Sequence, residues 1–363
     1  MKKLGISVYP EHAPREAWEA YMELAGKYGF KRVFTCLLSA EESREDMINS
    51  FTEFCRIAHK NGLSVSADTN PEVFKKLGAT PLDVSVFARM GLDIIRMDGH
   101  FGEFEDIEIT KNPYGTMIEY NASCTMGLDL MIEGGANREQ MCICSNFYPQ
   151  RNTGMGLARF KELNGRYQKL GLNNAAFVSS QEKNTHGPWK VYDGLPTLEI
   201  HRDLPIDLQV RHLNALGLCN DFMIGNAFAS EAELKAMSEL NLNKIAVKLW
   251  TAEDISGIEK EIIACPYHSS RDDCNELVIR SSMPRVIYKD AAIVPRRSGR
   301  KVFKRGDVVI VNDNLKHYAG ELMIVLTEIE AVDYYNYVGF IPEGEQLILD
   351  CIKPKYSFDL MAE

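Results

Sequence analysis

Apolar runs of strand length alternate with amphipathic stretches along the first part of the chain. Apolar residues recur at helical spacing over 14–28 and 43–61, and the second stretch stops at Asn-Gly. Thr80-Pro81 opens a third helical stretch that ends near Gly91. The pattern predicts eight short buried strands, at 4–9, 32–38, 63–68, 93–98, 117–121, 141–148, 175–179 and 221–226.

Strands that alternate with helices predict a parallel sheet. Eight such units within about 240 residues predict an α/β domain whose sheet closes into a (β/α)8 TIM barrel. An open Rossmann-like sheet is the alternative, but no Gly-x-Gly-x-x-Gly follows the first strand. We therefore assign 1–242 to a catalytic TIM-barrel domain.

From residue 243 the pattern changes to short β-like runs separated by Gly, Asn, Asp or Pro, with little helical periodicity. Residues 243–363 are therefore predicted to form a second domain, a small all-β barrel. Its expected strands are 244–250, 276–280, 285–287, 308–311, 321–326 and 337–341.

The connection between the seventh and eighth strands, 180–220, is unusually long. Its first part, 181–189, is polar and turn-rich and carries an aromatic residue, and 204–216 has a helical pattern. Long loops in compact domains are usually functional. In a barrel this loop would lie on the catalytic face, beyond the C-terminal ends of the strands.

Composition narrows the class of partner. The formal net charge of −10 argues against nucleic acid. No apolar run approaches the roughly 20 residues of a membrane helix, and the N-terminus leads directly into a strand, so we expect a cytoplasmic protein without a membrane segment. Nine cysteines without a secretory signal predict reduced thiols. Cys142 and Cys144 share a strand face but lack the further ligands of a metal site.

Polar side chains gather at the predicted C-terminal strand ends, where barrels of this kind carry their active sites. Burying so many polar groups unpaired would be costly, so we expect them to bind substrate. The candidates are Tyr9, Asp68, Arg96, Asp98, Glu119, Asn121, Asn146, Tyr148 and Asn226, with Glu199, His201 and Arg202 from the long connection.

Each candidate also has a purely structural interpretation. Arg96 and Asp98 share a strand face and could form an internal salt bridge. Asp68 precedes Thr-Asn-Pro and could cap the next segment. Asn121 and Asn146 could serve only to fasten loops.

Three carboxylates are candidates for acid–base catalysis. Asp98 and Glu119 lie on adjacent predicted strands, and glycoside hydrolysis needs such a pair, one protonated and one ionised. Glu199 is the third, because His201 and Arg202 nearby could tune its pKa. His201 could equally be a buried structural histidine. The sequence does not rank the three roles.

A phosphate cradle is predicted after the sixth strand. Tyr148, Arg151, Thr153 and Gly154 offer a guanidinium, hydroxyls and backbone amides at the start of a helix. A plain helix-initiating loop is the alternative.

A second phosphate locus is the basic set His268, Arg271, Arg280 and Arg285 in the β domain, which could reach a barrel mouth in the same chain or in a homodimer. Solvated surface charge is the alternative interpretation of this set.

Several motifs together resemble one family. They are Gly-Ile-Ser-Val-Tyr-Pro at 5–10, Val-Phe-Thr-Cys-Leu-Leu-Ser at 33–39, Ile-Glu-Tyr-Asn-Ala-Ser at 118–123, Asn-Phe-Tyr-Pro at 146–149, Gly-Leu-Pro-Thr-Leu-Glu at 194–199, Arg-Asp-Asp at 271–273, Lys-Arg-Gly-Asp at 304–307 and Tyr-Ala-Gly-Glu-Leu at 318–322. This ordered set resembles the MupG family of 6-phospho-N-acetylmuramidases and spans nearly the whole chain.

The resemblance implies a cytoplasmic glycosidase with a TIM barrel and a cyclophilin-like β-barrel domain. Such enzymes cleave the β-1,4 bond between N-acetylmuramic acid 6-phosphate and N-acetylglucosamine in peptidoglycan recycling, and no metal or organic cofactor is expected. Ser145 stands where the family pattern has His, and Met97 where it has Leu. Two alternatives therefore stay open: a hydrolase of another 6-phosphorylated disaccharide, and a non-catalytic sugar-phosphate-binding protein.

Overall fold

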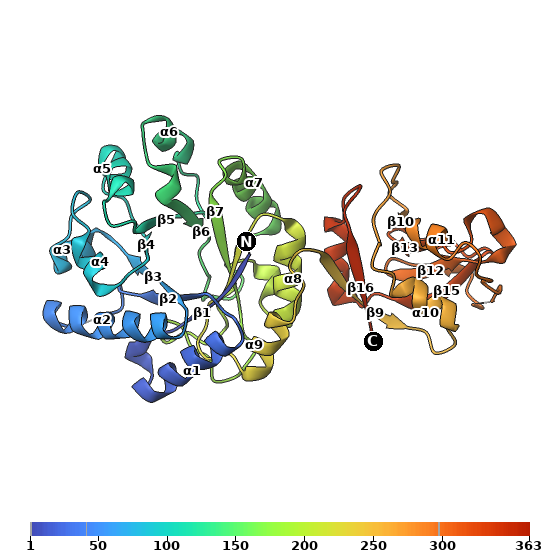
Figure 1. Ribbon diagram of the computed structural model, residues 1–363, viewed down its shortest axis with the longest axis horizontal. Coiled ribbons are helices and arrows are strands. Elements are labelled where there is room, and N and C mark those ends of the chain that lie inside the picture. Colours follow the sequence, from blue (N-terminus) through green and yellow to red (C-terminus); the bar gives the residue numbers. More distant parts are fainter. Residues whose placement is uncertain (1, 41, 297) are drawn as a thin grey trace. The chain divides into compact units, whose positions relative to one another are not determined.

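The computed structural model describes residues 2–40, 42–296 and 298–363. These form two compact units, one up to Leu240 without Asn214–Leu216, and the other from Asn241 onwards together with Asn214–Leu216. The first unit is a closed barrel of eight parallel strands, with helices on its outer side (Figure 1). This confirms the predicted TIM barrel and its eight strands.

The strands are β1 Lys3–Ser7, β2 Arg32–Cys36, β3 Ser64–Thr69, β4 Ile94–Met97, β5 Met117–Asn121, β6 Met141–Cys144, β7 Asn173–Val178 and β8 Asp221–Ile224. The helices are α1 Arg15–Lys27, α2 Arg44–Lys60, α3 Pro71–Leu77, α4 Ser85–Met90, α5 Glu103–Glu108, α6 Leu128–Glu133, α7 Leu157–Gln168, α8 Ile206–Leu216 and α9 Glu231–Ser238, and the short 3-10 turns are η1 Pro10–His12, η2 Ile109–Lys111, η3 Arg138–Gln140 and η4 Glu199–His201.

Local signals explain where the first helices begin and end. The Ser43 hydroxyl caps α2 by accepting from the Asp46 amide at 3.3 Å, and the chain leaves this helix through Gly62 at φ 74°. Asn70 caps α3 by accepting from the Val73 amide at 2.9 Å. Capping is therefore the role of Asn70, and Asp68 is left to face the barrel interior.

The third helical stretch begins later than predicted. Thr80 and Asp83 exchange two backbone hydrogen bonds, of 3.0 and 3.1 Å, which close a tight turn. The Asp83 carboxylate then accepts from the Ser85 amide at 2.9 Å, and α4 begins there. The expected start at Thr80-Pro81 is wrong because those residues form the turn.

The second unit contains a six-stranded sheet in the order β10-β13-β12-β15-β9-β16 and a separate two-stranded sheet of β11 and β14. Its strands are β9 Ile245–Thr251, β10 Val278–Ser281, β11 Val302–Phe303, β12 Asp307–Val311, β13 Leu322–Val325, β14 Ile329–Glu330, β15 Tyr335–Phe340 and β16 Phe358–Ala362. Its helical elements are α10 Gly257–Ile263, α11 Met283–Ile287, η5 Asp313–Tyr318 and η6 Glu343–Cys351. The curled sheet confirms a separate β-rich second part, whereas the expected strand at 285–287 is wrong because it lies in α11. A cyclophilin-like closure stays a prediction.

Other sequence predictions concern the cysteines and membrane segments. All nine cysteines are free, and Cys142 and Cys144 are buried, as expected for reduced structural thiols. In the described ranges, no helix has both the length and the apolar character needed to cross a bilayer.

The lower layer of the barrel interior is ionic. Arg32 at the start of β2 is 1% exposed, and its Nη2 donates to both oxygens of Glu119 on β5 at 2.6 Å. Its Nη1 donates to Asp221 on β8 at 3.2 Å, and its Nε donates to Ser66 on β3 at 3.2 Å. One guanidinium therefore joins four strands of the barrel. Burial raises the pKa of Asp221. A carboxyl that is more readily protonated repels the Glu119 carboxylate less, so the electrostatic cost of placing two acids around one guanidinium is lower.

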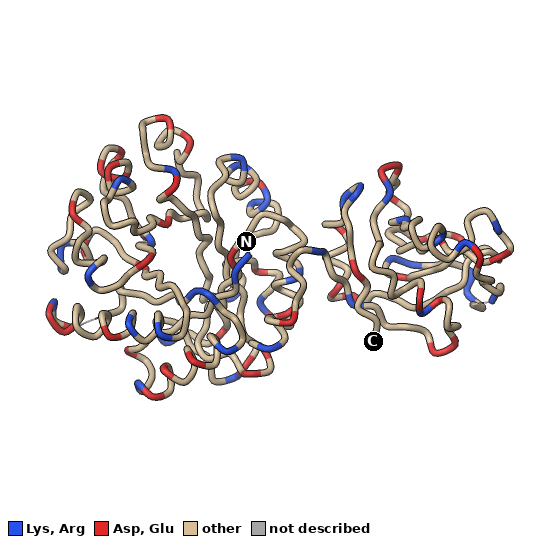
Figure 2. The backbone as a smooth tube through the Cα atoms, viewed as in Figure 1, with Lys and Arg blue, Asp and Glu red and all other residues tan. Residues whose placement is uncertain are grey.

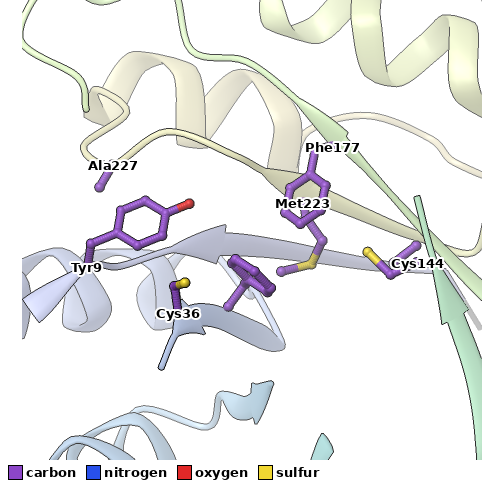
Figure 3. Packing of buried hydrophobic residues seen from close by; sticks show 8 residues of the cluster. Tyr9, Cys36, Cys144, Phe177, Met223 and Ala227 are labelled. Atoms are coloured by element: carbon purple, nitrogen blue, oxygen red, sulfur yellow. The ribbon is translucent and has the colours of Figure 1, made fainter. Parts of the chain in front are cut away.

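An apolar layer lies above this network. Cys144, Phe177 and Met223 come from three strands and pack with Tyr9 in the barrel interior (Figure 3). Gly5 on β1 makes room for Met223, because a Cβ there would lie 2.3 Å from the Met223 sulfur. These apolar side chains fill the barrel interior beside the ionic groups, and the charge of Glu119 still reaches Arg96 and Asp68.

We expect Arg32→Met to lower the free energy of unfolding by about 3–5 kcal/mol, because it leaves the Glu119 carboxylate buried without its cation. Urea unfolding followed by circular dichroism measures the change. The control is Arg56→Met, which removes an exposed arginine paired with Glu53 on the surface of α2 and should leave the midpoint near that of the wild type. Equal midpoints for the two variants would contradict a stabilising role for the buried network.

Candidate active site

The barrel mouth carries a buried ion pair from two neighbouring strands. Asp68, near the end of β3, is 5% exposed and accepts from Arg96 Nη1 on β4 at 2.5 Å. Arg96 Nη2 donates to the side-chain oxygen of Asn146, just beyond β6. The guanidinium therefore fixes the position of two groups at the mouth. These three predicted site residues are brought together.

Asp68 is a buried carboxyl that holds its proton unusually well. Burial is the largest cause and raises its pKa to about 6, because the charged form loses solvation. The Arg96 cation opposes the rise, whereas the negative charge of Asp98 adds to it. Acid groups with a pKa in this range suit general acid–base chemistry.

Asp98 is exposed and lies in the loop that follows β4. Its amide donates to the Thr69 carbonyl at 2.7 Å, which fixes this loop to the end of β3. The predicted salt bridge between Arg96 and Asp98 is replaced by the pair of Arg96 with Asp68. Asp68 and Asp98 are thus two acids at the ends of adjacent strands, and Asp98 remains open to solvent.

Glu119 does not lie at the mouth. Its side chain has no exposed surface, and both of its oxygens accept from Arg32 in the lower layer. The structure places Glu119 in the barrel core, paired with Arg32, and a direct action on substrate stays a prediction.

Glu199 fastens two loops to each other. Its carboxylate accepts from the backbone amides of Asn152 and Gly154, at 2.8 and 2.7 Å, and from Arg202 through two bonds of 2.7 Å. These hydrogen bonds, led by those from Arg202, lower its pKa to about 2. An acid with all these partners cannot donate a proton near neutral pH. Glu199 is therefore ionised and held by Arg202, and a catalytic role of Glu199 or a substrate contact of Arg202 stays a prediction.

The phosphate cradle predicted after β6 is already filled. The Gly154 amide is bonded to Glu199, and a Cβ at Gly154 would lie 2.8 Å from the Glu199 backbone. Thr153 donates to the Gln150 carbonyl at 2.6 Å, and Arg151 pairs with Asp203 at 2.7 Å. A carboxylate of the chain thus occupies backbone amides offered to phosphate, and phosphate binding at this loop stays a prediction.

Tyr148 lies beside this filled cradle. Its amide donates to the Pro196 carbonyl at 3.1 Å, and its own carbonyl accepts from Arg202 at 2.9 Å. The Tyr148 backbone therefore joins the loop after β6 to the long connection, and a substrate contact of its side chain stays a prediction.

Four further candidates support loops or packing. Asn121 accepts from the Ser123 amide at 2.8 Å, and Asn226 accepts from the Ser180 amide at 2.8 Å. His201 is buried against His212, with 2.7 Å between the ring nitrogens, and burial lowers its pKa well below the usual value. The Tyr9 hydroxyl donates to the Gly225 carbonyl at 2.6 Å. His201 and Asn226 are buried among protein partners, and contacts of these two residues with substrate stay predictions.

The basic residues of the second unit are largely paired. Arg271 bonds Asp273 at 2.6 Å, and Arg280 bonds the buried Glu321 at 2.6 Å. Arg285 lies over the Tyr318 ring, 5.0 Å from its centroid. His268 is buried and contacts Ser281 and the Ile263 carbonyl. Lys and Arg positions interleave with Asp and Glu positions along the chain in both units (Figure 2). A phosphate site in the second unit stays a prediction.

The long connection contributes residues that the sequence did not single out. His186 packs near Tyr9, with 6.2 Å between ring centroids, and Trp189 lies 6.4 Å from Phe147, just beyond β6. Phe147 in turn contacts Phe34 in the barrel interior. The length and turn-rich composition of the connection signalled a functional loop, but which of its side chains reach the mouth depends on the fold.

Comparison with known proteins agrees with this architecture. The family model described as 6-phospho-N-acetylmuramidase, N-terminal, matches residues 4–239, and the corresponding C-terminal model matches 245–361. An uncharacterised Bacillus cereus protein of known structure is 39% identical with a TM-score of 0.90, over 99% of both chains. A conserved Enterococcus faecalis protein of unknown function is 24% identical with a TM-score of 0.70, over 99% of this chain and 96% of the other, which supports the fold alone. No curated protein matches the chain.

The two family models together cover nearly the whole chain, and they correspond to its two compact units. The chain therefore belongs to the MupG family of 6-phospho-N-acetylmuramidases and is a glycosidase.

Proposed function

We propose that this glycosidase hydrolyses the β-1,4 bond between N-acetylmuramic acid 6-phosphate and N-acetylglucosamine, in the cytoplasm, during peptidoglycan recycling. Membership of the family supports the reaction class. The observation that carries the proposal is Asp68, a buried acid with a pKa of about 6 beside the exposed Asp98 at the barrel mouth. Two carboxyls in unlike environments are what glycoside hydrolysis requires.

In the proposed mechanism Asp68 is the general acid. Its protonated carboxyl donates to the glycosidic oxygen as the bond to N-acetylglucosamine breaks, which avoids expelling an alkoxide. Arg96 bonds the side chains of Asp68 and Asn146 and so fixes their positions. We propose that Arg96 and Asn146 thereby align Asp68 with the glycosidic bond of the substrate. Asp68 was expected from sequence as a substrate ligand, and its environment favours the catalytic role instead.

Asp98 is the proposed second carboxylate. Ionised and accessible from the mouth, it acts on the anomeric carbon as a nucleophile or on a water molecule as a base. In a substrate-assisted variant, it orients the 2-acetamido group of the muramic acid, which then attacks. Asn121 and Tyr148 are proposed to contact the sugar from the neighbouring loops.

We expect the wild type to release N-acetylglucosamine from 6-phospho-N-acetylmuramyl-N-acetylglucosamine, and Asp68→Asn to lower kcat by about 10²–10⁴-fold, because an amide cannot donate the proton. Mass spectrometry of the products measures both rates. Asp129→Asn is the matched control, since Asp129 is an acid of α6 paired with Arg166 away from the barrel strands. No release by the folded wild type would exclude this substrate, and full activity of Asp68→Asn would exclude Asp68 as the acid.

The pH profile gives an independent test. Because a general acid must be protonated, kcat should fall as pH rises through about 6, the pKa of Asp68. The Arg96 cation lowers that pKa, so Arg96→Gln should move the alkaline limb of the profile to higher pH, whatever the remaining rate. An alkaline limb that stays in place in Arg96→Gln would assign it to another group.

A further inference from the structure

A basic pocket lies in the long connection after β7. It has a volume of about 380 Å³, and its lining includes His12, Lys183, His186, Trp189, Lys190 and Tyr192. Two lysines and two histidines thus face one space, and among the described lining residues none is acidic. Such a lining attracts an anion.

Both lysines are available to a ligand. Lys183 and Lys190 are exposed, and neither forms an ion pair with any residue in the described ranges. The Glu11 carboxylate lies 3.9 Å from His12 Nε2. The pocket therefore keeps the charge of its lysines, in contrast to Arg151, which is neutralised by Asp203.

His186 is held in place with one ring nitrogen free. Its backbone exchanges two hydrogen bonds with Ala227 beyond β8, at 2.6 and 2.9 Å. Its Nδ1 donates to the Gly187 carbonyl at 3.2 Å, whereas its Nε2 is buried and without a hydrogen-bond partner in the described chain. With Nδ1 as the donor to this carbonyl, the ring is fixed in the wall of the pocket.

The loop that forms the pocket is fastened at a second point. His12 in η1 contacts the Pro188 carbonyl at 2.6 Å through Nε2, so this nitrogen is the donor. The rings of His12 and His186 are 5.9 Å apart and nearly perpendicular. The two histidines are thus positioned by contacts that exist before a ligand arrives, which reduces the ordering cost of binding.

The pocket adjoins the barrel mouth through aromatic side chains. His186 neighbours Tyr9, whose hydroxyl feels the charge of Asp68, and Trp189 neighbours Phe147. A sugar bound near Asp68 could therefore place a substituent in the basic pocket. Trp189 is 46% exposed and offers an apolar face beside the cations.

We infer that this pocket binds the phosphate monoester of a hexose 6-phosphate, with Lys183 and Lys190 as its ligands. The inference rests on the proposed function for the identity of the sugar, and it moves the phosphate from the loop of Arg151 to the long connection. Charge-assisted hydrogen bonds to a dianion supply the affinity, and the remote phosphate holds the glycosidic bond at Asp68.

The test is calorimetric binding of N-acetylmuramic acid 6-phosphate and of unphosphorylated N-acetylmuramic acid. We expect Lys183→Gln/Lys190→Gln to weaken binding of the phosphorylated sugar at least about tenfold and to leave the unphosphorylated sugar unaffected. In hydrolysis of the phosphorylated disaccharide, the same variant should raise KM with little change in kcat. Lys161→Gln, which replaces an exposed lysine of α7, and Arg151→Gln should both behave as the wild type.

The outcomes separate this inference from the proposed function. Unchanged affinity of the double variant for the phosphorylated sugar would overturn the inference, even if the wild type hydrolyses the disaccharide. Loss of affinity in Arg151→Gln instead would return the phosphate to the loop after β6. If the wild type binds the phosphorylated sugar through these lysines but releases no N-acetylglucosamine, the pocket stands and the proposed reaction fails.

Discussion

The buried guanidinium of Arg32 is the interaction on which the barrel depends. It donates to Ser66, Glu119 and Asp221, so a single side chain connects β2 with β3, β5 and β8. Each partner would be costly to bury alone, and none has another cation among the bonds described here. Because the bonds to these three partners require the strands in this order and register, the network favours the closed barrel over other arrangements of the same strands.

Asp221 in the network of Arg32 and Asp68 at the barrel mouth are both buried acids with a raised pKa. Asp221 lies at the start of β8 and bonds Arg32. Asp68 shares Arg96 with Asn146 and feels the charge of Asp98. Its position near the C-terminal end of β3, beside the exposed Asp98, therefore distinguishes Asp68 from the acid below.

The loops after β6 and β7 differ in how their polar groups are paired. The Glu199 carboxylate accepts from the backbone amides of Asn152 and Gly154 in the loop after β6. These two amides are therefore already bonded within the chain. The connection after β7 is fastened through His186 and His12 and keeps its lysines unpaired within the described chain. The lysines after β7 have no ion-pair partner in the described chain, whereas Arg151 after β6 is paired with Asp203. This difference is why we place the proposed anion pocket after β7.

The sequence by itself determined the barrel, its eight strands and the second β-rich unit, because apolar periodicity and turn residues act over short stretches of chain. It also placed Asp68, Arg96 and Asn146 at one end of the barrel, since parallel strands bring their C-terminal ends together. Only the tertiary structure decided which partners surround each acid. Glu119 finds its cation 87 residues away, and Glu199 finds the amides of another loop, whereas Asp98 stays open to solvent. The pKa of an acid depends on its burial and on charged or hydrogen-bonding partners that come from distant parts of the chain. The residues next to the acid in sequence do not determine either.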